Sequence, residues 1–165
     1  METHFNPELD LRLDCETRLN PLQLWAGWTQ TELYPHWFCP RPWVCTEAHI
    51  DLRPGGAFAT TMQGPEGQRM ANAPGCFLRV EAPKRLVWTN ILGPDFVPAE
   101  PSAQGFGFVV DLRFDALPTG GSRYQALVRH AKAQDKQVHA DMGFEAGWRA
   151  ALAQLEDLLV PHSRV

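Results

Sequence analysis

The sequence predicts an α+β fold in which a bent antiparallel β-sheet of about seven strands wraps around a long C-terminal helix, with two short helices after the first strand. Three observations support this prediction. Runs in which apolar and polar residues alternate, the pattern of half-buried strands, recur along the chain. Turn residues such as proline and glycine separate most of these runs, so an antiparallel meander is the simplest topology. Near the C-terminus, apolar residues recur instead at helical spacing.

The first three elements lie in the N-terminal part of the chain. Apolar and charged residues alternate over residues 9–17, which predicts a strand. Pro21 suits the first turn of a helix over residues 22–28. Thr29 is a possible N-cap of a second short helix, over residues 29–37.

Six further strands are predicted over residues 44–52, 57–63, 75–81, 86–92, 106–114 and 123–130. Asp51-Leu52-Arg53-Pro54-Gly55-Gly56 forms the turn between the first two, because proline cannot donate to the ladder and glycine adopts positive φ. Asp51 and Arg53 share one face, so we expect an ion pair or a hydrogen bond that stabilises the turn. Residues 93–105 contain three prolines, and for them a surface insertion is favoured over a lid.

The last element is a long helix predicted to begin after Asp135, as its N-cap, and to end before Pro161. Its apolar face carries small residues in the first half and leucines in the second. Gly143 and Gly147 each cost about 1 kcal/mol relative to alanine inside a helix, so something local must compensate for them. Either the helix packs closely on the sheet here, or its N-terminal half roofs a cavity.

Length and charge limit the possible classes of protein. The 165 residues are expected to form one domain, residues 1–165, since a domain of this size buries roughly 70% of its unfolded surface. The net charge is −4 and both signs are dispersed, which argues against nucleic acid or anionic membranes as partners. No run approaches the roughly 18 apolar residues of a membrane span, and the N-terminus is polar. We therefore expect a cytoplasmic monomer or homodimer.

Five segments carry a resemblance to a known family. They are Trp25-Ala26-Gly27-Trp28-Thr29, His36-Trp37-Phe38, Asp51 to Gly56, Leu86-Val87-Trp88-Thr89-Asn90 and Met142-Gly143-Phe144-Glu145-Ala146-Gly147-Trp148. In this order they resemble the activator-of-Hsp90-ATPase-like branch of the START/polyketide cyclase/Bet v 1 (SRPBCC) superfamily. The resemblance implies a helix-grip fold over the whole chain. It implies no single activity, because members include ligand binders, aromatase/cyclases and co-chaperone domains.

Strand alternation predicts which side chains face the interior, since residues two apart share a face. With Arg79 and Glu81 outside, the inner residues of their strand would be Cys76, Leu78 and Val80. The expected ligand-binding residues are Phe58, Met62, Trp88, Asn90, Phe108, Tyr124 and His130 from the sheet, with Phe144 and Gly147 from the helix. A mostly apolar set with a few polar groups is typical of a small-molecule pocket. The leading hypothesis is therefore binding of a hydrophobic or aromatic small molecule, without a cofactor.

Two other functions remain open. The first is an enzyme of the polyketide cyclase/aromatase type, with His130 as acid or base and Tyr124 or Asn90 polarising a carbonyl. Binding is preferred to catalysis because proton transfer needs aligned partners that spacing does not demonstrate, and each polar residue could equally be a hydrogen-bonded core residue. The second, implied by the resemblance, is an interaction module like the Hsp90 co-chaperone domain.

Several remaining residues are expected to be structural. The four potential zinc ligands are His36, Cys39, Cys45 and His49. Their spacing matches no standard zinc unit, so no metal site is expected. The tryptophans of the short helices and the next strand, Trp25, Trp28, Trp37 and Trp43, are expected to form a satellite core. His139 is expected in solvent or at the mouth of the cavity.

Overall fold

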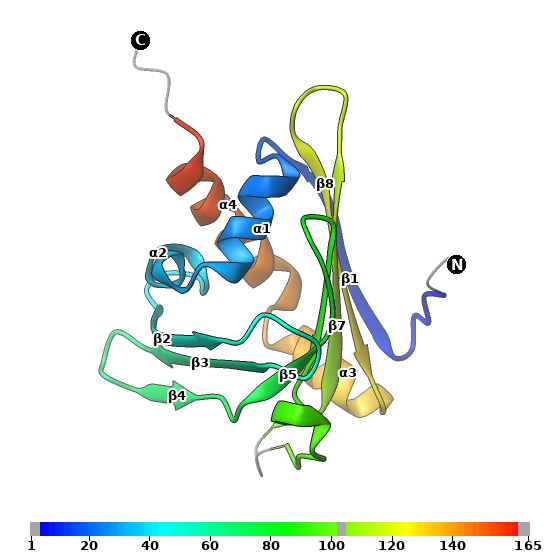
Figure 1. The fold of residues 1–165 in the computed structure, drawn as a ribbon. Helices are drawn as coiled ribbons and strands as arrows, with labels where there is room; N and C mark the ends of the chain where they lie inside the picture. Colours follow the sequence, from blue (N-terminus) through cyan, green and yellow to red (C-terminus); the bar gives the residue numbers. More distant parts are fainter. Residues whose placement is uncertain (1–3, 102–104, 162–165) are drawn as a thin grey trace.

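The structure, a computed structural model, describes residues 4–101 and 105–161 and has the predicted α+β architecture (Figure 1). The chain begins with β1 (Asp10–Thr17), α1 (Pro21–Thr29), the 3-10 turn η1 (Thr31–Leu33), α2 (Tyr34–Trp37), β2 (Val44–Ile50), β3 (Ala57–Gln63) and β4 (Arg69–Ala71). It continues with β5 (Gly75–Glu81), β6 (Arg85–Thr89), η2 (Pro94–Phe96), β7 (Phe108–Ala116), β8 (Ser122–His130), α3 (Ala133–Asp141) and α4 (Phe144–Leu159). Helices α1, α2 and α4 lie together on one side of the curled sheet.

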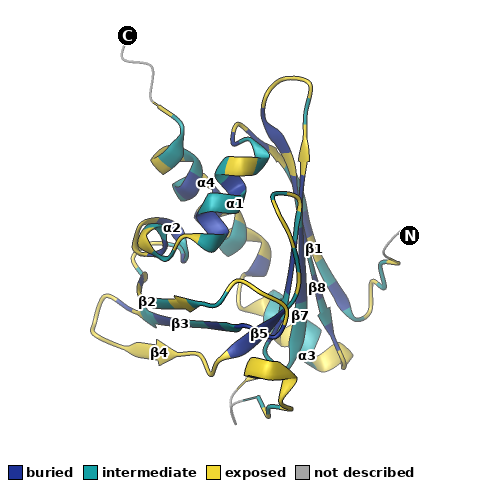
Figure 2. Cartoon of the chain, in the orientation of Figure 1, coloured by how far each residue is buried: buried dark blue, intermediate teal, exposed yellow. Residues whose placement is uncertain are grey.

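The strands form one antiparallel sheet in the order β1-β8-β7-β6-β5-β3-β2, and the short β4 pairs with β3 beside this path. The predicted strands are all present, but β4 is additional, because three exposed residues are too few to show alternation. Cross-strand register aligns the inner side chains in rows. One such row consists of Leu13, Ala126, Leu112, Leu86 and Val80. Figure 2 shows how burial concentrates where this sheet meets the helices.

A β-bulge in β5 changes the predicted inner face of that strand. The prediction of Cys76 and Leu78 as inner residues beside Val80 is wrong, because the pairing with β6 shifts register between Phe77 and Arg79. Phe77 pairs directly with Trp88 and is fully buried, with its ring 5.5 Å from that of Phe58. The extra residue of a bulge interrupts the alternation, and this brings Phe77 and Val80 to the same face.

The two N-terminal helices have different starting points from those predicted. Asn20 caps α1 with a capping box: its side chain accepts from the Gln23 amide at 2.9 Å, and the Gln23 side chain accepts from the Asn20 amide at 2.9 Å. Thr29 is not an N-cap, since its hydroxyl donates to the Trp25 carbonyl within α1. The tryptophans belong to the main core rather than a satellite, and Trp28 is only 3% exposed.

The predicted C-terminal helix is two helices, because Gly143 lies at φ +84° between α3 and α4. A left-handed residue ends the first helix, and only glycine adopts this conformation without strain. Asp135 is in the first turn of α3 and is not its cap. Close packing does not explain Gly143, since a Cβ there would have nothing within 4 Å. At Gly147, a Cβ would make ordinary contact with Pro40 at 3.5 Å.

The turn that follows β2 is held by the segment after β6. The predicted ion pair between Asp51 and Arg53 is present, with Nε 2.8 Å from Oδ2, and Arg53 also lies 3.3 Å from Asp95 in η2. The amide of Asp95 donates to the Gly55 carbonyl at 2.7 Å. The described part of residues 93–105 therefore packs on this turn as a surface segment, and residues 102–104 lie outside the described residues.

We expect opposite effects of alanine at the two glycines of the C-terminal region. Gly143→Ala should lower the free energy of unfolding by about 1 kcal/mol, because alanine is strained at positive φ. Gly147→Ala should raise it by about 0.5–1 kcal/mol, because the position is helical and has room for a methyl group. Urea unfolding monitored by circular dichroism measures both. Destabilisation by Gly147→Ala equal to that of Gly143→Ala would contradict this account.

Candidate ligand-binding site

A closed circuit of aromatic side chains connects the sheet to the helices. Its members, in order of contact, are Trp28, Phe38, Phe58, Trp88, Phe108, His139, Phe144 and Trp148. Neighbouring ring centroids are 4.6 to 6.4 Å apart, the range of favourable ring contacts. We call these eight residues the aromatic circuit. It contains four of the predicted ligand-binding residues: Phe58, Trp88, Phe108 and Phe144.

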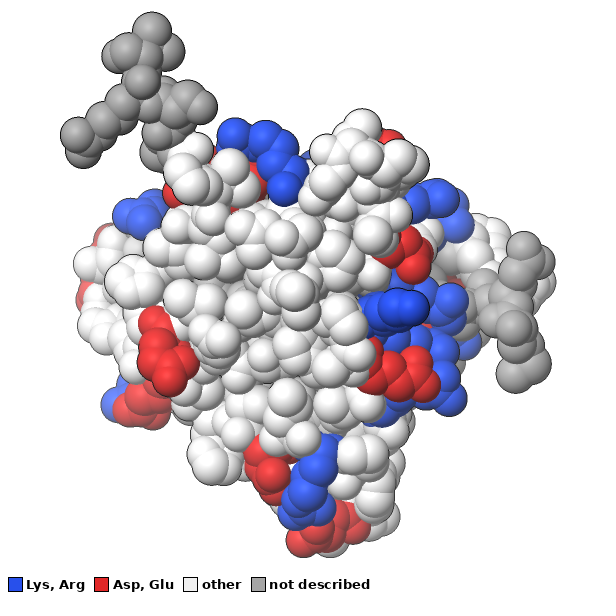
Figure 3. Space-filling model, turned by 45° about the horizontal axis from the view of Figure 1, so that its top comes forward, with Lys and Arg blue, Asp and Glu red and all other residues white. Residues whose placement is uncertain are grey.

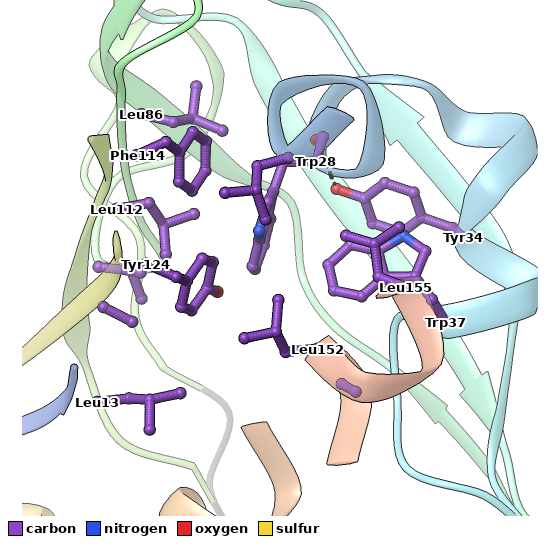
Figure 4. Close-up of a cluster of buried hydrophobic side chains, with 14 of the residues drawn as sticks. Leu13, Trp28, Tyr34, Trp37, Leu86, Leu112, Phe114, Tyr124, Leu152 and Leu155 are labelled. Carbon is purple, nitrogen blue, oxygen red and sulfur yellow. Dashed lines mark hydrogen bonds between the residues drawn. The ribbon is translucent and has the colours of Figure 1, made fainter. Parts of the chain in front are cut away.

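The inner face of the sheet is filled at one end and partly exposed at the other. Figure 4 shows the filled end, where Leu112 and Tyr124 extend from the strands towards Trp28 and Leu152. At the other end, apolar residues that pack against the core keep some exposed surface: Ile50, Met62, Trp88 and Phe108 from the sheet, with Phe38 and Trp148 from the helical side. Partly exposed aromatic side chains on the inner face therefore gather around the aromatic circuit, while Leu11, Cys15 and Val80 keep some exposed surface elsewhere on that face.

Tyr124 belongs to the filled end. It is 2% exposed and its ring is stacked 5.7 Å from that of Phe114. Its hydroxyl faces the indole of Trp28 (Figure 4). Burial raises the pKa of Tyr124. The neighbouring Nε1–H of Trp28 has no hydrogen-bond acceptor among the described residues. Tyr124 is thus enclosed by the core and lies away from the partly exposed rings.

Asn90 has a structural role in place of the predicted catalytic one. Its Nδ2 donates to the carbonyl of Phe106 at 2.9 Å, and its Oδ1 accepts from the amide of Phe108 at 2.8 Å. Strand β6 ends at Thr89, so the amide side chain continues the ladder to β7 where the backbone pairing stops. Both polar ends of Asn90 are therefore engaged by backbone groups.

His130, the acid or base of the enzyme alternative, has both ring nitrogens in hydrogen bonds. It is 5% exposed, with Nδ1 2.9 Å from the carbonyl of Leu9 and Nε2 2.9 Å from Nδ1 of His139. A carbonyl only accepts hydrogen bonds, so Nδ1 of His130 carries the proton that it donates to Leu9. A ligand has no access to either ring nitrogen.

His139 is the polar member of the circuit. It lies among rings, with centroids 4.9 Å from Phe106, 5.5 Å from Phe108 and 5.4 Å from Phe144. Burial, together with the neighbouring His130, lowers the pKa of His139 to about 4, so it is neutral near pH 7. The helix break at Gly143 turns α3 so that His139 meets Phe144, a contact that a single continuous helix does not predict.

Trp88 carries an unsatisfied polar atom within the circuit. Its Nε1 is buried and has no hydrogen-bond partner in residues 4–101 and 105–161. Leaving a buried donor unpaired costs roughly 1–3 kcal/mol. In the described chain, three buried side-chain polar atoms have no hydrogen-bond partner. Nε1 of Trp88 is the one among them that belongs to a partly exposed ring on the inner face.

Two surface hollows lie away from the circuit. One, of about 550 Å³, is lined by Glu16, Thr17, Arg18, Leu117, Thr119, Gly120, Gly121 and Glu156. The other, of about 630 Å³, is lined by His4, Phe5, Arg12, Asp111, Arg113, Gln125, Ala126 and Leu127. The first contains the ion pair of Arg18 with Glu156, and in the second Asp111 is paired with Arg85 and Arg113. We therefore place the candidate site at the exposed rings and not at these hollows.

Other classes of site find no support in the described residues. Across the described ranges, no group of three or more His, Cys, Asp or Glu side chains is placed to hold a metal ion. No helix in the same ranges has the length and apolar character needed to span a membrane. Figure 3 shows acidic and basic side chains intermixed around a broad uncharged area on the face in view.

We expect the free energy of unfolding to fall as the pH decreases from 6.5 towards about 4, by up to about 3 kcal/mol from His139. Because folding lowers the pKa of His139, the unfolded chain binds a proton in this range before the folded one does. The contribution is complete above pH 6.5 and disappears as the pH falls through the folded-state value. Urea unfolding across this range measures it.

The control is a comparison of two histidine variants. His139→Phe should lose most of this pH dependence, whereas His49→Phe, at an exposed position on β2, should keep it. Equal slopes in the wild type and His139→Phe would show that His139 is not responsible.

Comparisons with known proteins agree with the observed architecture. A protein structure from Nitrosomonas europaea superposes with a TM-score of 0.86 and 39% identity, covering 94% of this chain and 96% of that one. Structures from Rhodobacter sphaeroides (TM-score 0.79, 23% identity, 96% and 99% covered) and Mycobacterium smegmatis (0.77, 24%, 97% and 96%) share the fold. No curated protein matches the chain. Residues 18–160 match the family described as activator of Hsp90 ATPase homolog 1-like protein, and the chain belongs to this family.

Proposed function

We propose that the protein binds a hydrophobic or aromatic small molecule against the aromatic circuit, between the sheet and the N-terminal half of α4. The observation that carries this proposal is the uneven burial of the inner face. Leu112 and Tyr124 are closed off, while Trp88 and Phe108 keep exposed surface among other rings. Exposed apolar surface gathered in one region is typical of a binding site.

The proposed contact set differs in part from the sequence prediction. It keeps Phe58, Met62, Trp88, Phe108 and Phe144, and it adds His139 and Trp148. Asn90, Tyr124 and His130 are left out because their polar groups are engaged or enclosed. Gly147 is left out because its open side faces Pro40.

Binding is proposed in preference to catalysis because of the state of the polar groups. The predicted acid–base residue, His130, has both ring nitrogens in hydrogen bonds. The Nε1–H of Trp88 is a buried, unpaired donor on a partly exposed ring, and an oxygen of the ligand can satisfy it once the rings that cover it move aside. Such a contact removes the cost of the unpaired donor and orients the ligand, whereas the surrounding rings supply the apolar contact.

Replacing one ring of the circuit should weaken binding of a neutral aromatic probe, 1-nitronaphthalene. We expect Phe108→Leu to reduce its affinity about fivefold, since an aromatic pair contributes roughly 1 kcal/mol beyond its buried area. Quenching of tryptophan fluorescence measures the binding. Phe96→Leu, at an exposed position in η2, is the matched control and should bind the probe like the wild type. Absence of saturable binding to the wild type would refute the proposal.

The unpaired state of Trp88 can be tested through stability. Trp88→Phe should lower the free energy of unfolding by about 1–3 kcal/mol less than Trp37→Phe does. The Nε1–H of Trp37 donates to the Gly27 carbonyl at 3.1 Å, and its removal leaves that carbonyl unpaired. Urea unfolding of both variants gives the difference. Equal losses would mean that Trp88 has a partner in solution, and its donor would not be available to a ligand.

A further inference from the structure

The backbone before β1 orients a pair of histidines at the edge of the aromatic circuit. Leu9 accepts two hydrogen bonds from His130, one from its amide at 3.1 Å and one from its Nδ1 at 2.9 Å. The ring of His130 is therefore fixed, with Nε2 directed at His139. Any polar group that meets the ligand here is oriented through this chain of contacts, from Leu9 to His130 to His139.

The hydrogen bonds also define which nitrogen of each neutral ring is protonated. Nδ1 of His130 is protonated because it donates to a carbonyl, so Nε2 of the neutral ring has a lone pair. That lone pair accepts from Nδ1–H of His139. Nε2 of His139 is then left with a lone pair, and it has no hydrogen-bond partner among residues 4–101 and 105–161. In the neutral pair, this atom is an acceptor.

The surroundings of this acceptor are aromatic. From β7, Phe108 faces His139, and Phe106 lies just before that strand; Phe144 approaches from α4. His130 of β8 is the titratable group in contact with it, and on α3 itself Asp135 and Lys136 lie one turn away. Within the aromatic circuit, His139 is the one side chain that has a lone pair to accept a hydrogen bond, because phenylalanine has none and indole nitrogen only donates.

We propose that His139 Nε2, oriented by His130, accepts a hydrogen bond from an acidic hydroxyl of the bound molecule, so that the site selects planar ligands carrying a phenol or an enol. This inference rests on the proposed function and specifies its ligand class. His139 contacts the ligand, and His130 is a positioning residue. The neutral state of His139 near pH 7, which follows from its lowered pKa, keeps the acceptor available.

The hydroxyl keeps its proton in this hydrogen bond. Burial lowers the pKa of His139 to about 4, so the neutral imidazole accepts the hydrogen bond and the ligand O–H bond stays intact. His130 holds the ring of His139 in place, while its own Nδ1–H donates to the Leu9 carbonyl.

Two probes that differ only by a hydroxyl test the inference. 4-Nitro-1-naphthol carries an acidic hydroxyl, and 1-nitronaphthalene lacks it. Both are measured at about pH 5, where the naphthol keeps its proton and His139 is still neutral. We expect the wild type to bind the naphthol roughly two- to tenfold more tightly, the range of one hydrogen bond. His139→Phe, which keeps an aromatic ring, should remove this preference and still bind 1-nitronaphthalene. His49→Phe should keep the preference. The absorption spectrum of the bound naphthol shows whether its proton has been transferred.

The possible results separate the inference from the proposed function. Binding of both probes with equal affinity, unchanged in His139→Phe, would overturn the hydroxyl preference and leave small-molecule binding standing. Binding of neither probe would overturn both. Nitrogen NMR of the free protein tests the pair without any ligand: both histidines should be protonated at Nδ1 and unprotonated at Nε2 near pH 7. A proton found on Nε2 of His139 would overturn the proposed acceptor.

Discussion

The pairing of β1 with β8 is the constraint on which the rest of the structure depends. The two strands join the beginning of the chain to its last strand through eight consecutive residue pairs. This pairing aligns Leu13 with the central inner row and brings the Leu9 carbonyl to His130. It also places Thr17 so that its hydroxyl donates to Glu156 of α4 at 2.7 Å, which ties the last helix to the first strand. The core, the last helix and the histidine pair therefore all depend on the pairing of β1 with β8.

Most of the architecture could be predicted because it repeats a local rule. Alternation identified the strands and most inner residues, including Trp88 and Phe108, since each depends only on neighbours two positions away. The prediction failed at Leu78, where a bulge adds a residue, and at Gly143, where positive φ ends a helix whose apolar pattern continues. Both are single-residue backbone features that leave little trace in periodicity.

The site was less predictable because its polar groups depend on partners distant in sequence. Asn90 had the right face for a ligand, but its use by the backbone of Phe106 and Phe108 follows from the place where β6 ends. His130 had the right burial, but its engagement requires Leu9 on one side and His139 on the other. Spacing alone carries no information about such contacts. The apolar rings were found more easily, because burial on one face is sufficient to place them.

Helix α3 differs from the other long helices in its attachment to the fold. None of its nine residues is fully buried, and Gly143 separates it from α4. Local opening of an element costs little when it buries little, so the backbone amides of α3 should exchange with solvent hydrogen faster than those of α4, which buries Leu152 and Leu155. The helix that carries His139 is therefore held to the core less firmly than α4.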